Sequence, residues 1–276
     1  MAEIGGPGLG GALVQLVGAP FALLVDAVSY LASALGVSAV RKREKPVRID
    51  PAPLRSQASE GFRFTFSSPY LRATLGEAAS YNLCWQIVLP ILTLFAVKEL
   101  DMSPGTLGLV LSVGAVGALL GAAFTDRLAH RVGLGRTLVI AAVIGDLAPL
   151  LLPVAHRGTW AAPLLAVAFF VQGFGITACN VHTMTIRQTV TPERLLGRTN
   201  AAYLFVALGM KPVGSLLGGW LGTHLGLRGA LVVGTVGLLS TSLFLILSPL
   251  RTVRTLDSVR PEPPEEVRAA APTSTP

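Results

Sequence analysis

Long runs without charge are the feature that most constrains how this chain can fold. Between Met1 and Val40 only Glu3 and Asp26 are charged, before a basic cluster begins at Arg41. A helix needs about 20 mainly apolar residues to cross the hydrocarbon core of a bilayer. Most of the apolar segments are close to that length, and eight can be marked: 4–17, 20–40, 72–97, 105–125, 137–153, 161–183, 199–222 and 228–248. We therefore expect an all-α membrane protein with about eight transmembrane helices.

The composition excludes the main alternatives to a helical membrane protein. Charged residues make up 13% of the chain and the mean hydropathy is +0.62, whereas soluble domains are about a quarter charged. The strands of a membrane barrel would alternate polar and apolar residues, and the long apolar runs do not. The net charge of +7 could suggest nucleic acid. Because the basic residues lie between apolar runs, we expect no nucleic-acid partner.

The basic residues predict how the chain is oriented. Of the 22 Lys and Arg residues, eighteen lie in the loops that follow even-numbered segments and in the C-terminal tail: Arg41, Lys42, Arg43, Lys45, Arg48, Arg55, Arg63, Arg72, Arg127, Arg131, Arg136, Arg187, Arg194, Arg198, Arg251, Arg254, Arg260 and Arg268. The other loops hold only Lys98, Arg157 and Arg228. Cytoplasmic loops carry the excess of Lys and Arg. We therefore expect a multi-pass protein of the cell (plasma or inner) membrane with both termini in the cytoplasm.

An internal repeat suggests how the segments are grouped. When the chain is shifted by 208 positions, the first two segments align with the last two, and the paired residues include Leu9 with Leu217, Gly10 with Gly218, Gly11 with Gly219 and Gly18 with Gly226. The repeating unit would then have six helices. We expect the last two helices of an N-terminal bundle at 1–40, a cytoplasmic linker at 41–71, a six-helix bundle at 72–250, and a disordered, proline-rich tail at 251–276.

Glycine motifs occupy both copies of the repeat. The first copy contains the run Gly6-Pro7-Gly8-Leu9-Gly10-Gly11, and the second contains Lys211, Pro212, Gly214, Gly218 and Gly219. The first run resembles the G-P-x-x-G-G motif in the fifth helix of major facilitator superfamily exporters. Glycines allow two helix backbones to touch, and proline permits bending. The resemblance implies a conformational role, and close helix packing without a transport role is the alternative.

Two loops extend this resemblance. The segment Asp126–Arg136 is similar to the cytoplasmic G-x-x-x-D-R-x-G-R-R loop of the superfamily, in which Arg131 and Gly133 fit the pattern while Asp126 and His130 depart from it. An ordinary positively charged loop is the alternative. The segment Arg187–Asn200 resembles the loop between helices ten and eleven of the branch that exports drugs and siderophores, including macrolide and enterobactin exporters.

The second loop also makes a local structural prediction. Thr191, Pro192 and Glu193 can start a short helix along the membrane face, with the threonine as cap and the proline in the first turn. By resemblance, the eight segments correspond to helices 5–12 of a major facilitator fold that lacks roughly its first four helices.

Ionisable groups at membrane depth are the first candidates for a substrate or proton pathway, because each is costly there unless it is paired or wet. They are Asp26, Glu77, Asp146 and Lys211. The alternative is structural, such as an ion pair of Lys211 with Glu77 or Asp146.

Uncharged polar residues in the spans are further candidates. Asn82 and Gln86 lie one turn apart on one helix face, and Gln172 lies in the sixth segment. Hydrogen bonds between helices are the alternative role for these residues. Cys84 and Cys179 have no metal-ligand spacing, so we expect no metal and no cofactor.

These observations favour a secondary active transporter rather than an enzyme. The chain contains no G-x-x-x-x-G-K-[ST] motif for ATP and no D-x-x-D or H-E-x-x-H cluster. The resemblance implies proton-coupled efflux of small amphipathic compounds by alternating access, with a small-molecule substrate, the lipid bilayer and a proton gradient as partners. The alternative is an N-terminally truncated transporter fragment without autonomous transport activity.

Overall fold

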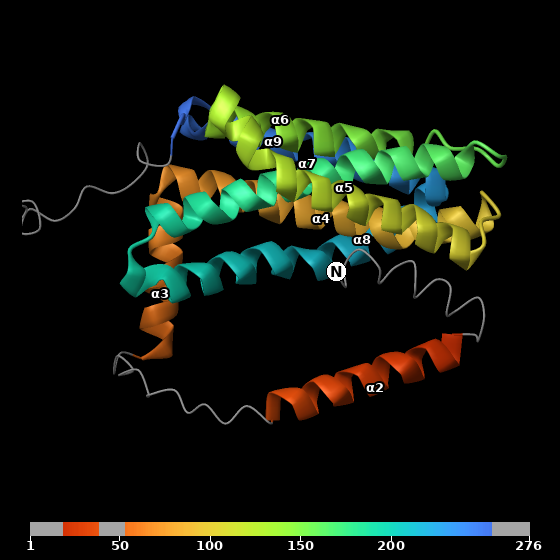
Figure 1. Ribbon diagram of the computed structural model, residues 1–276, viewed down its shortest axis with the longest axis horizontal. Coiled ribbons are helices and arrows are strands. Elements are labelled where there is room, and N and C mark those ends of the chain that lie inside the picture. Colours follow the sequence, from red (N-terminus) through yellow and green to blue (C-terminus); the bar gives the residue numbers. More distant parts are fainter. Residues whose placement is uncertain (1–18, 39–52, 256–276) are drawn as a thin grey trace, which may run out of the picture.

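The computed structural model describes residues 19–38 and 53–255, and every regular element within them is helical (Figure 1). The α-helices are α2 (Ala19–Ser38), α3 (Leu54–Ser67), α4 (Pro69–Lys98), α5 (Pro104–Val132), α6 (Leu134–Leu147), α7 (Ala161–Val190), α8 (Leu196–Leu239) and α9 (Thr241–Ile246). Short 3₁₀ helices are η1 (Ala148–Leu151), η2 (Glu193–Leu195) and η3 (Pro249–Thr252). The expected all-α fold is confirmed.

Five stretches of the described residues are long and apolar enough to cross a membrane. They are Pro69–Lys98, Pro104–Val132, Leu134–Leu151, Ala161–Val190 and Glu193–Ile246. The last is 54 residues long and contains the seventh predicted segment and nearly all of the eighth. The first predicted segment lies outside the described residues, and the second falls largely on α2. The count of eight spans therefore stays a prediction.

A glycine reverses the chain within α8. Gly226 has φ 73° and ψ 169°, outside the helical region, and divides α8 into two arms. Positive φ is readily adopted by glycine and costly for residues with a Cβ. The first arm approaches α4 where Gly214 meets the Leu83 carbonyl, and the second returns where Gly237 faces Cys84. Gly226, which the sequence repeat pairs with Gly18, thus marks a reversal of the chain.

Two glycine seams hold the bundle together. The first is the predicted one, at which Gly214 and Gly218 of α8 touch the backbone of α4. The second joins α5 to α7, because Gly117 and Gly121 face the carbonyl oxygens of Phe170 and Phe174 so closely that a Cβ would overlap them. Gly117 and Gly121 belong to none of the motifs named from the sequence. Small residues let backbones approach inside membranes, where packing replaces hydrophobic collapse.

Buried side chains form two main clusters, one toward each end of the helices. The larger surrounds Phe95 and Leu92 of α4 and includes Leu165 of α7 and Leu231 of α8. The second surrounds Leu138 of α6 and brings in η3. Many large apolar side chains elsewhere remain exposed, as expected of helices solvated by lipid.

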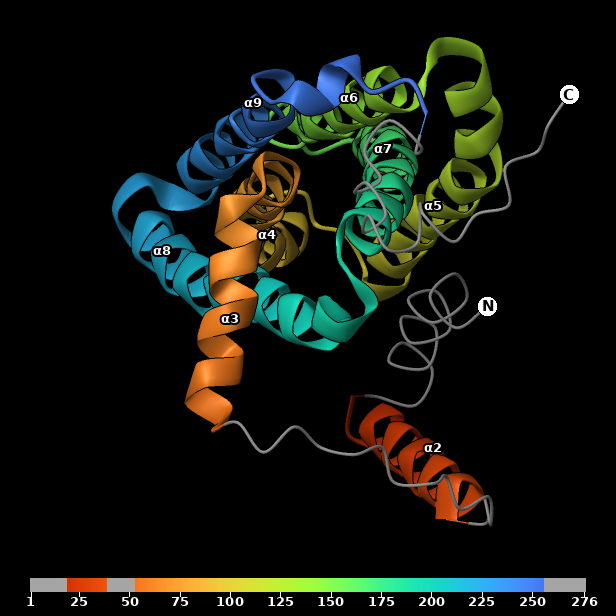
Figure 2. The ribbon, with the colours of Figure 1, turned by 90° about the vertical axis from the view of Figure 1, so that its left-hand side faces the viewer.

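Helix α3 is a feature that was not predicted within the expected linker. It crosses the end of the bundle (Figure 2) and packs on α8, where Gly61 lies against the Arg198 carbonyl. Glu60 of α3 forms ion pairs with Arg194, at 3.3 Å, and with Arg198. The role of residues 41–71 as a linker between bundles stays a prediction.

The predicted cap at Thr191 is wrong. Residues 193–195 form only the 3₁₀ turn η2, its N-cap is Pro192, and no side chain caps it. The buried Thr191 hydroxyl has no hydrogen-bond partner in the described part of the chain. The α7 helix continues to Val190, so Thr191 is its C-terminal cap residue and is drawn into the interior.

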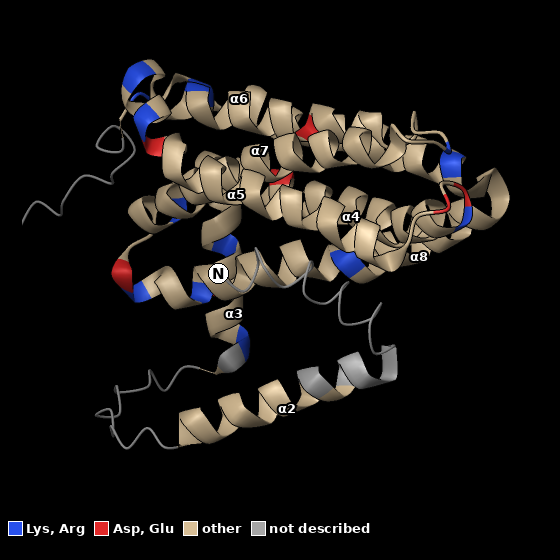
Figure 3. Ribbon diagram, turned by 45° about the vertical axis from the view of Figure 1, so that its right-hand side comes forward, with Lys and Arg blue, Asp and Glu red and all other residues tan. Residues whose placement is uncertain are grey.

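Charge is unevenly distributed between the two ends of the bundle, as Figure 3 shows. Basic side chains gather where α5 meets α6, where α8 begins and at η3. At the other end Arg157 pairs with Asp101 at 3.6 Å and Arg228 with Glu99 at 3.8 Å. The excess of unneutralised positive charge therefore lies at one end. The cytoplasmic assignment of that end stays a prediction.

Candidate functional site

Two carboxyl groups lie inside the helical bundle. Glu77 of α4 and Asp146 of α6 are each 3% exposed. The start of α4 is fixed by Ser68, whose hydroxyl accepts the Leu71 N–H, and by Pro69 in the first turn. This start places Glu77 about two turns into the helix, on its buried side.

Asp146 is held by the break between α8 and α9. The Thr241 hydroxyl donates a hydrogen bond of 2.7 Å to Oδ2 of Asp146, whereas the hydroxyl of the next residue, Ser242, donates to the Leu239 carbonyl. Thr241 is the first residue of α9, after the chain interrupts the helix at Ser240. The interruption therefore brings a hydroxyl group of α9 to a carboxylate on α6.

Glu77 has weaker partners. The Cys179 thiol of α7 lies 4.0 Å from Oε1 of Glu77, and Thr183 lies 3.9 Å from the same sulfur. A thiol is a weak donor. Glu77 and Asp146 are close enough to interact electrostatically, so α4, α6 and α7 share one acidic interior site.

Neither carboxylate has a cationic partner among the described residues. The ion pairs found there involve only Glu60, Glu99 and Asp101. Lys211 is exposed on the first arm of α8, so the ion pair considered from the sequence, between Lys211 and Glu77 or Asp146, does not form. An ionised carboxylate at membrane depth is costly without such a partner or water.

The uncharged polar candidates divide into two kinds. Gln172 of α7 is buried and donates a hydrogen bond to the Tyr81 hydroxyl of α4, which is the interhelical role considered above. Asn82 donates to Ala78 of its own helix at 2.7 Å. Gln86 packs beside Gly214 of α8. The structure therefore brings Gln172 toward the acidic site through Tyr81, but it does not show Asn82 and Gln86 acting together.

Some residues of the site were missed by sequence reasoning. Tyr81 follows Glu77 by four residues and Cys179 precedes Thr183 by four, so helical spacing could have suggested both pairs. Thr241 offers no comparable signal, because its contact with Asp146 spans 95 positions. Long-range contacts of this kind depend on packing between helices.

The predicted conformational residues have different surroundings. Gly133 ends α5 with φ 93°, and the neighbouring N–H groups of Leu134 and Gly135 donate to the carbonyls of Arg254 and Val253. Arg131, Pro212 and Gly219 are exposed, and open space surrounds Gly219. The motif residues Gly6, Pro7, Gly10 and Gly11 lie outside the described residues. Asp26 lies on α2 and its side chain is not described.

The described residues contain no cluster of three or more His, Cys, Asp or Glu side chains that could hold a metal ion. Apolar helices of membrane-spanning length surround a small set of polar and acidic side chains. This arrangement defines a multi-pass helical membrane protein with ionisable groups in its interior.

Comparison with known proteins identifies the family. The family described as transmembrane secretion effector, within the major facilitator superfamily, matches residues 1–273. The chain therefore belongs to this family, and it is a member of a transporter family rather than an enzyme. The resemblance inferred from the motifs is confirmed.

Curated relatives are exporters of the same superfamily. The chain is 28% identical to the enterobactin exporter of Salmonella choleraesuis over 188 residues, which cover 67% of this chain and 44% of the relative. It is 27% identical to the enterobactin exporter of Citrobacter koseri over 87% of this chain and 56% of that one. A multidrug resistance efflux pump homologue of Lactococcus lactis is 28% identical over 88% of this chain and 58% of the pump. The chain spans about half the length of the curated relatives it matches.

Proposed function

We propose that these helices belong to a secondary exporter of small amphipathic compounds that is driven by a proton gradient. Membership of the secretion-effector family supports export, and relatives named for enterobactin and multidrug export support a small-molecule substrate. Alternating access would require the bundle to move against a second bundle around a central site.

The observation that carries proton coupling is the pair of buried carboxylates Glu77 and Asp146. They lie inside membrane-length helices without a cation at ion-pair distance in the described part of the chain. Acids inside transmembrane segments mark the proton relays of many pumps and transporters. In this proposal the carboxylates take up and release protons as the site changes its access to water. Asp26 is a third proton-pathway candidate, from its place in an apolar segment.

We propose a different role for Lys211 and Gln172. Lys211 is exposed on an apolar arm of α8, where a cation is costly unless it meets water, an anion or another protein surface. We assign it to a substrate or proton pathway on that face. Gln172, held by Tyr81, would line the path between the face and the carboxylates.

Inside-out membrane vesicles that contain the 276-residue chain test this function. A proton gradient should drive uptake of a fluorescent amphipathic dye, and an uncoupler should abolish it. Asp146→Asn and Glu77→Gln should each reduce the initial rate at least tenfold, and Asp26→Asn should also reduce it.

Asp101→Asn is the matched control, because Asp101 is an exposed loop carboxylate. Its rate should equal that of the wild type. Unchanged coupling in all three site variants would remove the carboxylate assignment. Absence of gradient-driven uptake by the wild-type chain would contradict export by this chain.

A further inference from the structure

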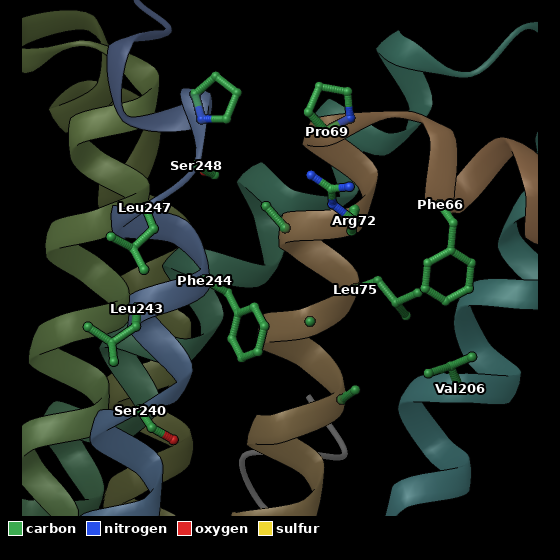
Figure 4. A pocket seen from close by; sticks show the side chains of 14 residues that line it. Phe66, Pro69, Arg72, Leu75, Val206, Ser240, Leu243, Phe244, Leu247 and Ser248 are labelled. Atoms are coloured by element: carbon green, nitrogen blue, oxygen red, sulfur yellow. The ribbon is translucent and has the colours of Figure 1, made fainter.

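A groove of about 730 Å³ lies on the outside of the bundle between α4, α9 and the end of α3 (Figure 4). Its walls are mostly apolar and include Phe66 of α3, Leu75 of α4, and Leu243 and Phe244 of α9. Phe244 lies over Gly76, where any side chain would collide with its ring. Glycine at this position therefore lets the aromatic ring reach α4.

The groove faces the surroundings of the bundle. Phe66, Leu243 and Phe244 are each about half exposed, and Leu247 at its margin is 80% exposed. These residues lie near the end of the bundle at which the basic side chains gather, which we call the basic end. An exposed apolar groove of this size indicates a binding surface.

The groove contains one basic side chain. Arg72 lies in the first turn of α4 at the same end of the groove as Pro69 and Ser248, as Figure 4 shows. Its backbone N–H donates to the Ser68 carbonyl, but its guanidinium group makes no ion pair or hydrogen bond within the described ranges. The hydroxyls of Ser240 and Ser248 donate to carbonyls of their own segments. Arg72 is thus the side chain that is free to bind a ligand here.

The groove has a cation at one end and an apolar wall beyond it, which suits a ligand with an anionic headgroup and an apolar chain. Ala79, which lies seven residues after Arg72, also lines the groove, and seven helical residues rise about 10 Å. The apolar wall therefore extends about 10 Å along α4 from the cation, toward the middle of this membrane-length helix. Basic pockets between membrane helices are suited to anionic lipid headgroups, which are abundant in the cytoplasmic leaflet.

We propose that the groove between α4 and α9 is a binding site for an anionic phospholipid, with the phosphate on Arg72 and an acyl chain along Leu75, Leu243 and Phe244. Glu77 and Asp146 do not line this groove, and the proposal does not depend on proton coupling. It does rest on the proposed orientation, which places the basic end in the cytoplasmic leaflet.

Native mass spectrometry of the purified 276-residue chain tests this proposal. The protein is exchanged into detergent with equal amounts of phosphatidylglycerol and phosphatidylcholine, and retained lipid is counted. The wild type should retain phosphatidylglycerol preferentially. Arg72→Gln should lower this preference about fivefold, the factor one basic residue contributes near an anionic surface. Arg72→Lys should keep most of the preference.

Two further variants separate the groove from general surface charge. Arg63→Gln removes an exposed arginine of α3 that does not line the groove, and it should leave retention unchanged. Ala79→Leu fills the apolar wall with Arg72 intact, and it should reduce retention. Circular dichroism of each variant establishes that the helices are present.

Several outcomes would overturn the site. Equal retention of the two lipids by the wild type would mean that the protein does not select an anionic headgroup. An equal loss in Arg63→Gln and Arg72→Gln would leave only nonspecific attraction to basic charge. Displacement of the lipid by excess glycerol phosphate would show a small-anion site without a chain. Retention unaffected by Ala79→Leu would exclude the groove as the place where the chain binds.

Discussion

The polar side chains inside this bundle mainly supply hydrogen-bond partners to groups that a membrane cannot hydrate. Asp146 shows the principle, because its carboxyl group is buried in a helix and receives the Thr241 hydroxyl from a different segment. Asn82 shows the opposite case, in which a polar side chain bonds its own helix and adds no tertiary contact. Burial alone therefore does not identify a functional residue, and the partner must be known.

Thr241→Val tests the importance of the hydroxyl at Asp146. Valine keeps the shape of threonine but removes the 2.7 Å donor. Leaving a buried acceptor short of a partner costs about 1–3 kcal/mol. We expect a lower midpoint in thermal unfolding of the purified protein in detergent.

The matched control for this change is Thr93→Val. Thr93 is exposed, and its hydroxyl bonds only the Leu89 carbonyl of its own helix. Its midpoint should stay within error of the wild type. Equal midpoints for both variants would mean that Thr241 contributes nothing to Asp146.

Whole helices in this bundle are positioned by glycines, and the two glycine seams differ in how visible they are in the sequence. Gly214 and Gly218 lie four residues apart within a motif that the sequence repeat marks. Gly117 and Gly121 have the same spacing, but the sequence does not indicate which helix packs against them, and the structure shows that it is α7. Periodicity reveals which face of a helix is small, and only the fold reveals which backbone lies against it.

Gly117→Ala should destabilise the α5–α7 pair. The added Cβ would overlap the Phe170 carbonyl, and backbone cannot move aside as a flexible side chain can. Overpacking of this kind costs about 1–3 kcal/mol. We expect a lower thermal midpoint and faster hydrogen exchange in α5 and α7.

Gly219→Ala is the comparison within the predicted motif. Nothing lies within 4 Å of a Cβ at this position, and alanine favours a helix over glycine by about 1 kcal/mol. The variant should be as stable as the wild type or more so. A stable variant that loses dye uptake would support a conformational role for Gly219, and a destabilised one would contradict the open space around it.

At the scale of the whole molecule, hydropathy identified the spanning helices well because lipid imposes length and composition together. It did not identify α3, whose residues are too polar and too few to span, nor the acidic site shared by α4, α6 and α7. Glu77 and Asp146 were individually predicted as candidates. Their proximity could not be predicted, because it depends on which helix faces lie against each other.

The orientation of the bundle can be measured by labelling two positions at opposite ends. Gly197 lies at the basic end, at the start of α8, and Thr159 lies in the loop before α7; both are exposed. The native residues Cys84 and Cys179 are buried, so the wild type should label little. In intact cells a membrane-impermeant maleimide should label Thr159→Cys and spare Gly197→Cys, because the basic end is expected inside. In inside-out vesicles the pattern should reverse. Labelling of Gly197→Cys alone in intact cells would show that the basic end faces outward. The Arg72 groove would then lie in the outer leaflet and not in the cytoplasmic leaflet that the lipid proposal requires.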